Sequence, residues 1–327
     1  MTRKLFIWVL AIFFLVTASS ADAQPIGKAP RLGLLAPGTS ERNPQIEGFQ
    51  QALRDLGYAE GRTIHIEYRF AQGKDDRISE LAAELVGLKV DAIVTFSHRV
   101  ALIVKNATTS IPIVFAFVND PVGVGLVPSL ARPGGNITGV SLQGLDLIGK
   151  RLELLKETVP KVDRLVYLRN PVEPYSPIYW KEVQSVSRAL GIRQVSSIEA
   201  KAPEDFERVF AAMAREHPDA LLVETNSLNT GNRKRISNFA TDHRLPTMCG
   251  LTYFMDAGAL MSYSPNLPDH FHRVAVLTDK VIKGVKPAEL PVEQPTKFEL
   301  IINLKTAKQI GLTIPASVLY RADKVTR

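Results

Sequence analysis

The segment FAFVNDPVGVGLVPSLARPGGNITGVSL, residues 115–142, begins as an apolar strand, breaks into a glycine-rich turn and ends in a second short apolar strand. Gly123 and Gly125 stand where the first two glycines of a dinucleotide-binding fingerprint would stand, directly after a strand. Pro128 takes the place of the third glycine, and no strand ending in Asp or Glu follows about 20 residues later. The segment therefore predicts no nucleotide cofactor, and its glycines are expected to serve the geometry of the turn.

Apolar strand patterns alternate with helical patterns on both sides of this segment, from Arg31 onward. Such alternation predicts βαβ units and a mostly parallel sheet, so the expected fold class is α/β. A short helix is expected over 122–130, and a long helix over 145–158 separates a first series of strands from a second. Further helices are expected at 44–56, 75–88, 99–108, 176–190, 203–216 and 230–243, and strands at 31–38, 63–73, 91–97, 111–118, 136–142, 164–171, 193–200, 220–227 and 246–251.

The length of 327 residues predicts two lobes, because it exceeds the size of a typical single core. The patterns after the second series predict a strand at 258–264, a helix at 269–283, a strand at 298–303 and a helix at 304–310. These elements would form an unusual tail if they only extended the second series, so we expect a return to the first lobe. Several crossings between the lobes would then form a hinge. The expected division is 24–139 with about 265–298 for lobe 1, and about 140–264 with 299–327 for lobe 2.

The N-terminus predicts a secretory signal peptide. Arg3 and Lys4 precede an apolar run over 5–16, and small residues follow, ending in Ala21-Asp22-Ala23. The apolar run is short for a membrane span, and no cysteine lies near the cleavage site to accept a lipid. We expect cleavage after Ala23 and a soluble periplasmic protein, with an uncleaved N-terminal anchor as the alternative.

Composition and motifs argue against several classes of function. The 40 Lys and Arg residues exceed the 33 Asp and Glu residues by seven, but they are scattered and form no basic run with interleaved aromatics, so no nucleic-acid partner is predicted. The single cysteine, Cys249, excludes an intrachain disulfide. The six histidines form no H-E-x-x-H pair, and the segment Gly139-Val-Ser141-Leu-Gln143 lacks the last glycine of a nucleophile elbow. We expect no catalysis, no metal and no cofactor.

Several blocks of the chain are similar to one known family. They include PRLGLLAPG (30–38), ALRDLGYAEGRTIHIEYR (52–69), GALMSYSPN (258–266) and LPVEQPTKFELIINLKTAKQIGLTIP (290–315). With these blocks the chain resembles the ABC-transporter substrate-binding proteins of the family that includes members binding tryptophan and other aromatic amino acids. The resemblance implies a type I periplasmic-binding fold, in which two Rossmann-like lobes joined by a three-segment hinge close over a small ligand without chemistry.

Residues that follow the strands are the candidates for ligand contact, because ligands of open parallel sheets bind outside the carboxyl ends of the strands. Asp120 could equally cap the short helix expected after it, and Asn170 and Asn226 could satisfy only local backbone groups. Aromatic side chains are candidate walls, although such rings more often belong to a core, and Tyr253 is one of them. The predicted ligand-binding residues are Ser40, Phe96, Ser97, His98, Asn119, Asp120, Ser141, Asn170, Tyr175, Thr225 and Asn226.

The resemblance implies a monomeric periplasmic protein that captures an amino acid, an aromatic molecule or a related carboxylate and delivers it to an ABC permease and ATPase complex. A carboxylate would suit the helix N-termini expected after Ser97 and Thr225, which carry partial positive charge. If Asn226 contacts the ligand, Asn226→Ala should weaken binding and leave unliganded melting nearly unchanged, whereas a turn-forming role predicts the opposite. A secreted sensor that presents its ligand to a receptor would have the same fold and is the alternative.

Overall fold

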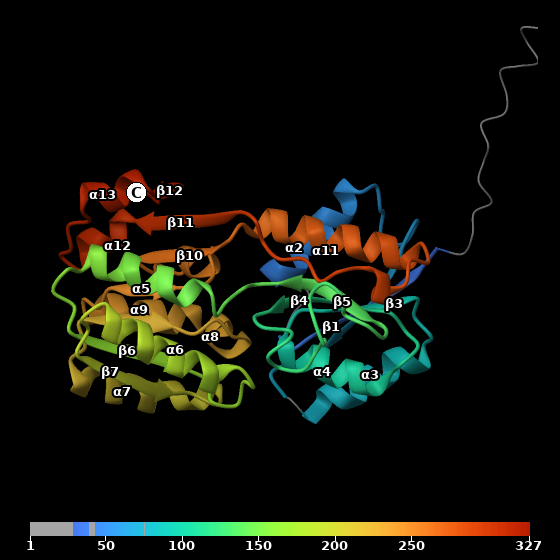
Figure 1. Ribbon diagram of the computed structural model, residues 1–327, viewed down its shortest axis with the longest axis horizontal. Helices are drawn as coiled ribbons and strands as arrows, with labels where there is room; N and C mark the ends of the chain where they lie inside the picture. Colours follow the sequence, from blue (N-terminus) through green and yellow to red (C-terminus); the bar gives the residue numbers. More distant parts are fainter. Residues whose placement is uncertain (1–28, 39–42, 75) are drawn as a thin grey trace, which may run out of the picture.

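The computed structural model describes residues 29–38, 43–74 and 76–327 and has two α/β lobes, which lie side by side in Figure 1. The predicted signal peptide and Ser40 lie outside the described residues. The α/β fold class with parallel sheets is confirmed. Within the described ranges, no helix has the length and apolar character needed to cross a membrane.

Lobe 1 is built on a parallel sheet with helices on both faces. Its strands in spatial order are β2 (His65–Phe70), β1 (Arg31–Ala36), β3 (Ala92–Thr95), β4 (Ile113–Val118) and β5 (Ile137–Ser141). One face carries α2 (Pro44–Asp55) and α11 (Leu267–Ile282), and the other face carries α3 (Asp76–Gly87) and α4 (His98–Ala107).

The alternation of side chains along β1 explains the two faces. Leu34 joins the core cluster that contains Phe49 of α2 and Phe271 of α11. Its neighbour Leu35 joins the cluster that contains Ile78 of α3 instead. Both leucines are fully buried, so β1 must be covered on both sides.

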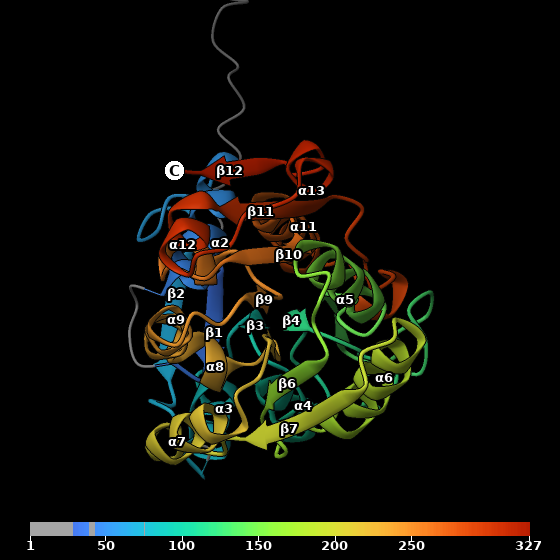
Figure 2. The ribbon, with the colours of Figure 1, turned by 90° about the vertical axis from the view of Figure 1, so that its left-hand side faces the viewer.

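Lobe 2 is built on a sheet with more strands, and Figure 2 labels all of them except β8. They are β12 (Lys324–Thr326), β11 (Phe298–Asn303), β10 (Met261–Pro265), β9 (Thr247–Cys249), β8 (Ala220–Val223), β6 (Arg164–Arg169) and β7 (Gln194–Glu199). The sheet is parallel except where β11 pairs antiparallel with β10. The exception arises because the chain comes from lobe 1 and enters β11 at the edge of the sheet where the parallel strands have their carboxyl ends.

The helices of lobe 2 also cover both faces of the sheet. The core of one face includes residues of α5 (Leu147–Thr158), α6 (Ser176–Ala189), α12 (Leu304–Gln309) and α13 (Ala316–Tyr320). The core of the other includes residues of α7 (Phe206–Glu216), α9 (Arg233–Asp242) and α10 (Tyr253–Asp256). Shorter elements are α8 (Ser227–Gly231) and the 3-10 turns η1 (Pro203–Asp205) and η2 (Pro287–Glu289).

In the described part of the chain, three segments connect the lobes: the β5–α5 link, the β10–α11 link and the segment from η2 to β11. These links are joined by hydrogen bonds. The Ser141 N–H donates to the Glu293 carbonyl (2.9 Å), and the Asn266 N–H donates to the Lys297 carbonyl (2.9 Å). The third link is therefore hydrogen-bonded to both of the other links.

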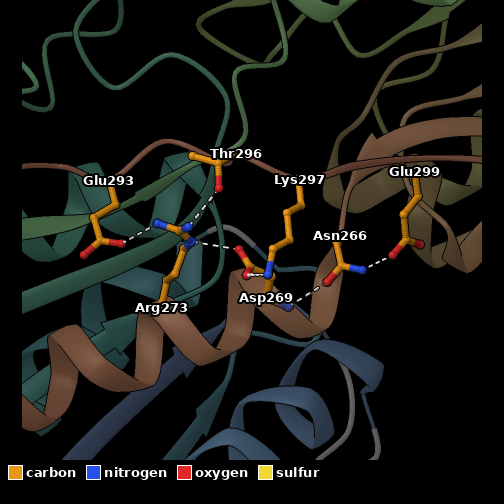
Figure 3. A network of polar contacts seen from close by, with 7 residues as sticks. All are labelled: Asn266, Asp269, Arg273, Glu293, Thr296, Lys297 and Glu299. Atoms are coloured by element: carbon orange, nitrogen blue, oxygen red, sulfur yellow. Dashed lines mark hydrogen bonds and ion pairs between the residues drawn. The ribbon is translucent and has the colours of Figure 1, made fainter.

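A polar network on α11 strengthens the hinge (Figure 3). Arg273 donates to Asp269 (2.7 Å), to Glu293 (3.1 Å) and to Thr296 (2.9 Å). Lys297 also donates to Asp269 (2.8 Å). These pairs are partly exposed, so each stabilises the fold only modestly, but together they tie the third link to α11.

The short helix predicted over 122–130 is wrong, because the chain forms consecutive turns there. The Asp120 carboxylate accepts a hydrogen bond from the Gly123 N–H (2.8 Å), which organises the first turn. Gly125 has a positive φ of 72°, a conformation that ends helical winding. The helix predicted over 230–243 is present as α9, and a separate short helix, α8, precedes it and ends at Gly231.

Candidate functional site

A cleft of about 240 Å³ lies between the lobes, at the ends where the parallel strands leave their sheets. Its volume is slightly below the roughly 300–1,000 Å³ of pockets for drug-sized ligands, which suits a small solute. Lobe 1 contributes Pro37, Gly38, Asn43, Pro44, Gln45, Phe96, Ser97, His98, Phe117 and Leu142, and lobe 2 contributes Glu173, Tyr175, Thr225, Asn226, Ser227, Thr230, Gly231, Arg233, Leu251 and Tyr253.

Aromatic rings from both lobes form the walls of the cleft. Phe96 and Phe117 come from lobe 1 with ring centroids 6.3 Å apart, and Tyr175 and Tyr253 come from lobe 2. Phe117 has a φ of 58°, and the register of β4 against β5 shifts between Phe115 and Val118. Bulges of this kind redirect a side chain, and here the backbone accepts a strained conformation that places Phe117 at the cleft.

Charged side chains of both signs also line the cleft, and both come from lobe 2. Glu173 lies in the loop between β6 and α6, and Arg233 begins α9. The Arg233 guanidinium donates to the Thr230 carbonyl through Nη1 (3.0 Å), which fixes the side chain at the cleft. A guanidinium matches the geometry of a carboxylate, and a carboxylate binds an ammonium group. Sequence reasoning missed both residues, since neither lies directly at the end of a predicted strand.

The two lobes contact each other beside the cleft. The carbonyl oxygen of Thr225 accepts a hydrogen bond from the Tyr175 hydroxyl (2.7 Å) within lobe 2 and from the Asn119 side-chain amide (3.2 Å) of lobe 1. The ring of His98 in lobe 1 lies 4.6 Å from that of Tyr175. The structure therefore has the lobes closed on each other.

His98 is buried at this contact and is 3% exposed. Neither ring nitrogen has a hydrogen-bond partner among the described residues. Burial lowers the pKa of the His98 imidazole to about 3, so the ring is neutral at physiological pH. Ser97, the preceding residue, caps α4, and its side chain accepts from the Val100 N–H at a long 3.5 Å.

A buried carboxylate lies behind the lobe 2 wall of the cleft. Glu224 is 2% exposed and accepts hydrogen bonds from Tyr167, Asn170, Ser176 and Asn226. Burial raises the pKa of the Glu224 carboxyl, and these hydrogen bonds oppose the rise. The Asn226 side chain is thus held on one side by Glu224.

The predicted site residues divide into two groups. Phe96, Ser97, His98, Tyr175, Thr225 and Asn226 line the cleft. The others that the structure describes lie near it without lining it: Asn119 bridges the lobes, Asp120 caps a turn, Ser141 lies in the hinge, and the Asn170 side chain accepts from the Val172 N–H (3.1 Å).

The described ranges hold no group of three or more His, Cys, Asp or Glu side chains that could bind a metal ion. Cys249 is buried at the end of β9, and burial raises the pKa of its thiol. The side chains that line the cleft offer aromatic rings, charged groups and amides for contact with a ligand.

Comparison with known proteins identifies the family. Residues 39–326 match the family described as ABC transporter substrate binding protein. The chain belongs to this family, whose members bind a solute for an ABC transporter and are not enzymes.

The relatives include proteins that bind aromatic amino acids. The tyrosine-binding protein of Clostridioides difficile (strain R20291) is 29% identical over 266 residues, which cover 81% of this chain and 76% of that protein. The ABC domain from Streptococcus pneumonia in complex with L-Trp has a TM-score of 0.83 and 25% identity, covering 90% of this chain and 99% of that one. A conserved domain protein from Vibrio cholerae O1 biovar El Tor strain N16961 has a TM-score of 0.85 and 26% identity, covering 91% and 100%.

Proposed function

We propose that this protein is the periplasmic binding component of an ABC importer and that its ligand is an aromatic amino acid. The observation that carries the proposal is the composition of the cleft, where aromatic walls from both lobes enclose a space that Glu173 and Arg233 also line. An aromatic amino acid carries a ring, a carboxylate and an ammonium group. The names of the relatives from Clostridioides difficile and Streptococcus pneumonia support the same ligand class.

In this proposal the ligand is oriented by its charges. Its carboxylate pairs with Arg233 and its ammonium group with Glu173, both on lobe 2. Its ring then packs against Phe96 and Phe117 of lobe 1, since offset or edge-to-face ring pairs are favourable. A ligand that touches both lobes stabilises the closed form through contacts that the open form lacks. Residues 1–23 would supply the export signal.

The proposal is tested by calorimetric titration of protein that has been unfolded and refolded to remove any copurified ligand. L-tyrosine, L-tryptophan and L-phenylalanine should bind. In a thermal-unfolding assay, a ligand concentration of about 100 times Kd should raise the free energy of unfolding by roughly 2.7 kcal/mol. Tyramine lacks the carboxylate and should bind more weakly, as should L-leucine, which lacks the ring. Stabilisation only by sugars or by metal cations would contradict the proposal.

A further inference from the structure

We propose that Glu224 is a positioning residue for the cleft, and that its buried carboxylate holds the loops of lobe 2 in the arrangement that meets lobe 1. Glu224 does not line the cleft, so it would act without touching the ligand. The inference rests on the proposed binding function, but part of its test needs no ligand.

Each oxygen of the Glu224 carboxylate accepts two hydrogen bonds within the described residues. Oε1 accepts from the Tyr167 hydroxyl (3.0 Å) and from the Ser176 hydroxyl (2.7 Å). Oε2 accepts from the Asn170 backbone N–H (2.8 Å) and from the Asn226 side-chain amide (2.9 Å). All four partners are neutral, so hydrogen bonding and not ion pairing defines the arrangement.

These partners lie at the ends of three different elements that frame the cleft. Asn170 follows β6, Ser176 begins α6, and Asn226 is the N-cap of α8, where its Oδ1 accepts from the Asn229 N–H (2.8 Å). The ladder between β6 and β8 continues to the Glu224 N–H, which donates to the Leu168 carbonyl (2.9 Å), so it fixes where these two strands end. Beyond the ladder, the carboxylate is the acceptor that the three ends share.

Thr225, the residue after Glu224, makes the contact with lobe 1. The carbonyl of Thr225 accepts from Tyr175, which precedes Ser176, and from Asn119 of lobe 1. A displacement of Glu224 would move Thr225 and Tyr175 together, and the Asn119 contact depends on both. Loss of the carboxylate should therefore weaken closure and, with it, ligand affinity.

The two oxygens of the Glu224 carboxylate accept from donors of different kinds, and this difference predicts which substitution of Glu224 weakens ligand binding more. Hydroxyl groups can accept as well as donate, so Tyr167 and Ser176 can turn toward the amide nitrogen of a Gln side chain. The N–H groups of Asn170 and Asn226 only donate and still need an oxygen. Glu224→Gln preserves that oxygen, whereas Glu224→Ala leaves both N–H groups without an acceptor.

The first measurement is the Kd of L-tyrosine or L-tryptophan for full-length mature protein at a temperature where every variant is folded by circular dichroism. Glu224→Ala should raise Kd at least about ten-fold, and Glu224→Gln should stay within about three-fold of the wild type. If Glu224→Ala does not fold, Glu224→Asp replaces it, because its shorter side chain cannot reach all the donors. An unchanged Kd in the disruptive variant would overturn the proposal.

A double-mutant cycle separates positioning from general stability. Asn119→Ala should cost less affinity in the Glu224→Ala background than in the wild type, because the contact it removes is already weakened. Asp219→Ala is the matched control, since this carboxylate accepts from the Asp163 and Arg164 N–H groups at the opposite end of the same sheet. It should lower the melting temperature and leave Kd unchanged. Additive effects of the Glu224 and Asn119 substitutions would contradict the proposal.

The second measurement needs no ligand. Spin labels on introduced cysteines in α3 of lobe 1 and α7 of lobe 2 report the distance between the lobes, and the native Cys249 is buried. Unliganded Glu224→Ala should populate longer distances than the wild type, and Glu224→Gln should not. Identical distributions would overturn the role of Glu224. If wild-type protein binds no aromatic amino acid, the proposed function fails, and this measurement still decides the role of Glu224.

Discussion

The rings of His98 and Tyr175 lie 4.6 Å apart although the two residues belong to opposite lobes. Tyr175 covers an imidazole whose nitrogens have no partner among the described residues. Opening of the lobes would separate the rings and expose His98 to water. Ligand binding is thereby coupled to the burial of a titratable group.

We predict that ligand affinity falls as the pH falls below about 6.5. The pKa of His98 is about 3 in the closed form because of burial, and in the open form it should return toward the ordinary value of about 6.5. A proton then binds the open form preferentially, so acidification opposes closure. Between pH 7.5 and pH 5.0, Kd measured by calorimetry should rise about 30-fold.

His98→Phe should remove most of this pH dependence, because phenylalanine keeps a ring beside Tyr175 and lacks titrating nitrogens. His270→Leu is the matched control. His270 is also buried, with its pKa lowered to about 3 by burial, but its ring partners Phe117 and Phe271 both belong to lobe 1. Its burial does not depend on closure, so that variant should keep the wild-type pH dependence of Kd. A steep profile in His98→Phe would refute the coupling.

Arg233→Gln should weaken the binding of aromatic amino acids roughly ten- to a hundred-fold, because a buried hydrogen bond to a charged group is lost. The matched control is Arg235→Gln in the same helix, where the side chain pairs with the exposed Glu207 and does not line the cleft. That variant should bind normally in the same calorimetric assay. The amide of L-tyrosine, which has no carboxylate, should bind weakly and be insensitive to Arg233→Gln. Equal affinities of the two variants for L-tyrosine would argue against Arg233 as the carboxylate partner.

Asn226→Ala should lower the unfolding free energy of unliganded protein by about 1–2 kcal/mol. The Asn226 side chain caps α8 by accepting from the Asn229 N–H and donates to Glu224, so both of its polar atoms serve lobe 2. Urea denaturation without ligand measures the change. Asn226→Ser retains a capping oxygen and should recover part of the loss. Wild-type stability in Asn226→Ala would show that the cap is dispensable and would favour direct ligand contact.

Gly144→Ala should destabilise the protein by about 1–3 kcal/mol. Gly144 lies in the first link between the lobes, and an added Cβ would lie 2.3 Å from Asn119 Oδ1 and 2.4 Å from the Tyr179 hydroxyl. In contrast, Gly149 in α5 has nothing within 4 Å of an added Cβ. Gly149→Ala should therefore stabilise by about 0.5–1 kcal/mol through helix propensity. Urea denaturation of the pair distinguishes crowding at the link from a general effect of alanine.

The sequence was most informative where burial and periodicity agree. Strands such as β4, in which every residue is buried, and amphipathic helices such as α2 were predicted within a few residues. The rule that ligands lie beyond the strand ends also led to His98 and Thr225, which line the cleft, because each lies within three residues of the end of a strand. The lobe boundaries and the binding role of each candidate residue stay predictions.

Features that depend on distant contacts could not be predicted. Phe117 belongs to an unbroken apolar run, and nothing in the run IVFAFV signals the bulge that redirects it. The antiparallel pairing of β11 depends on the route of the chain through lobe 1. Glu173, in the loop between β6 and α6, and Arg233, at the start of α9, both line the cleft although 60 positions separate them in the sequence. For the segment after Asp120, local turn formation prevailed over a weak helical pattern.

The routing of the chain through the hinge also constrains the order in which the protein can fold. α11 completes the core of lobe 1, and β11 and β12 complete the sheet of lobe 2, yet these elements are among the last to be synthesised. Each core lacks some of its side chains until these elements are present, and contacts between residues far apart in sequence form slowly. We therefore expect both lobes to complete their folding only after almost all of the chain has been synthesised.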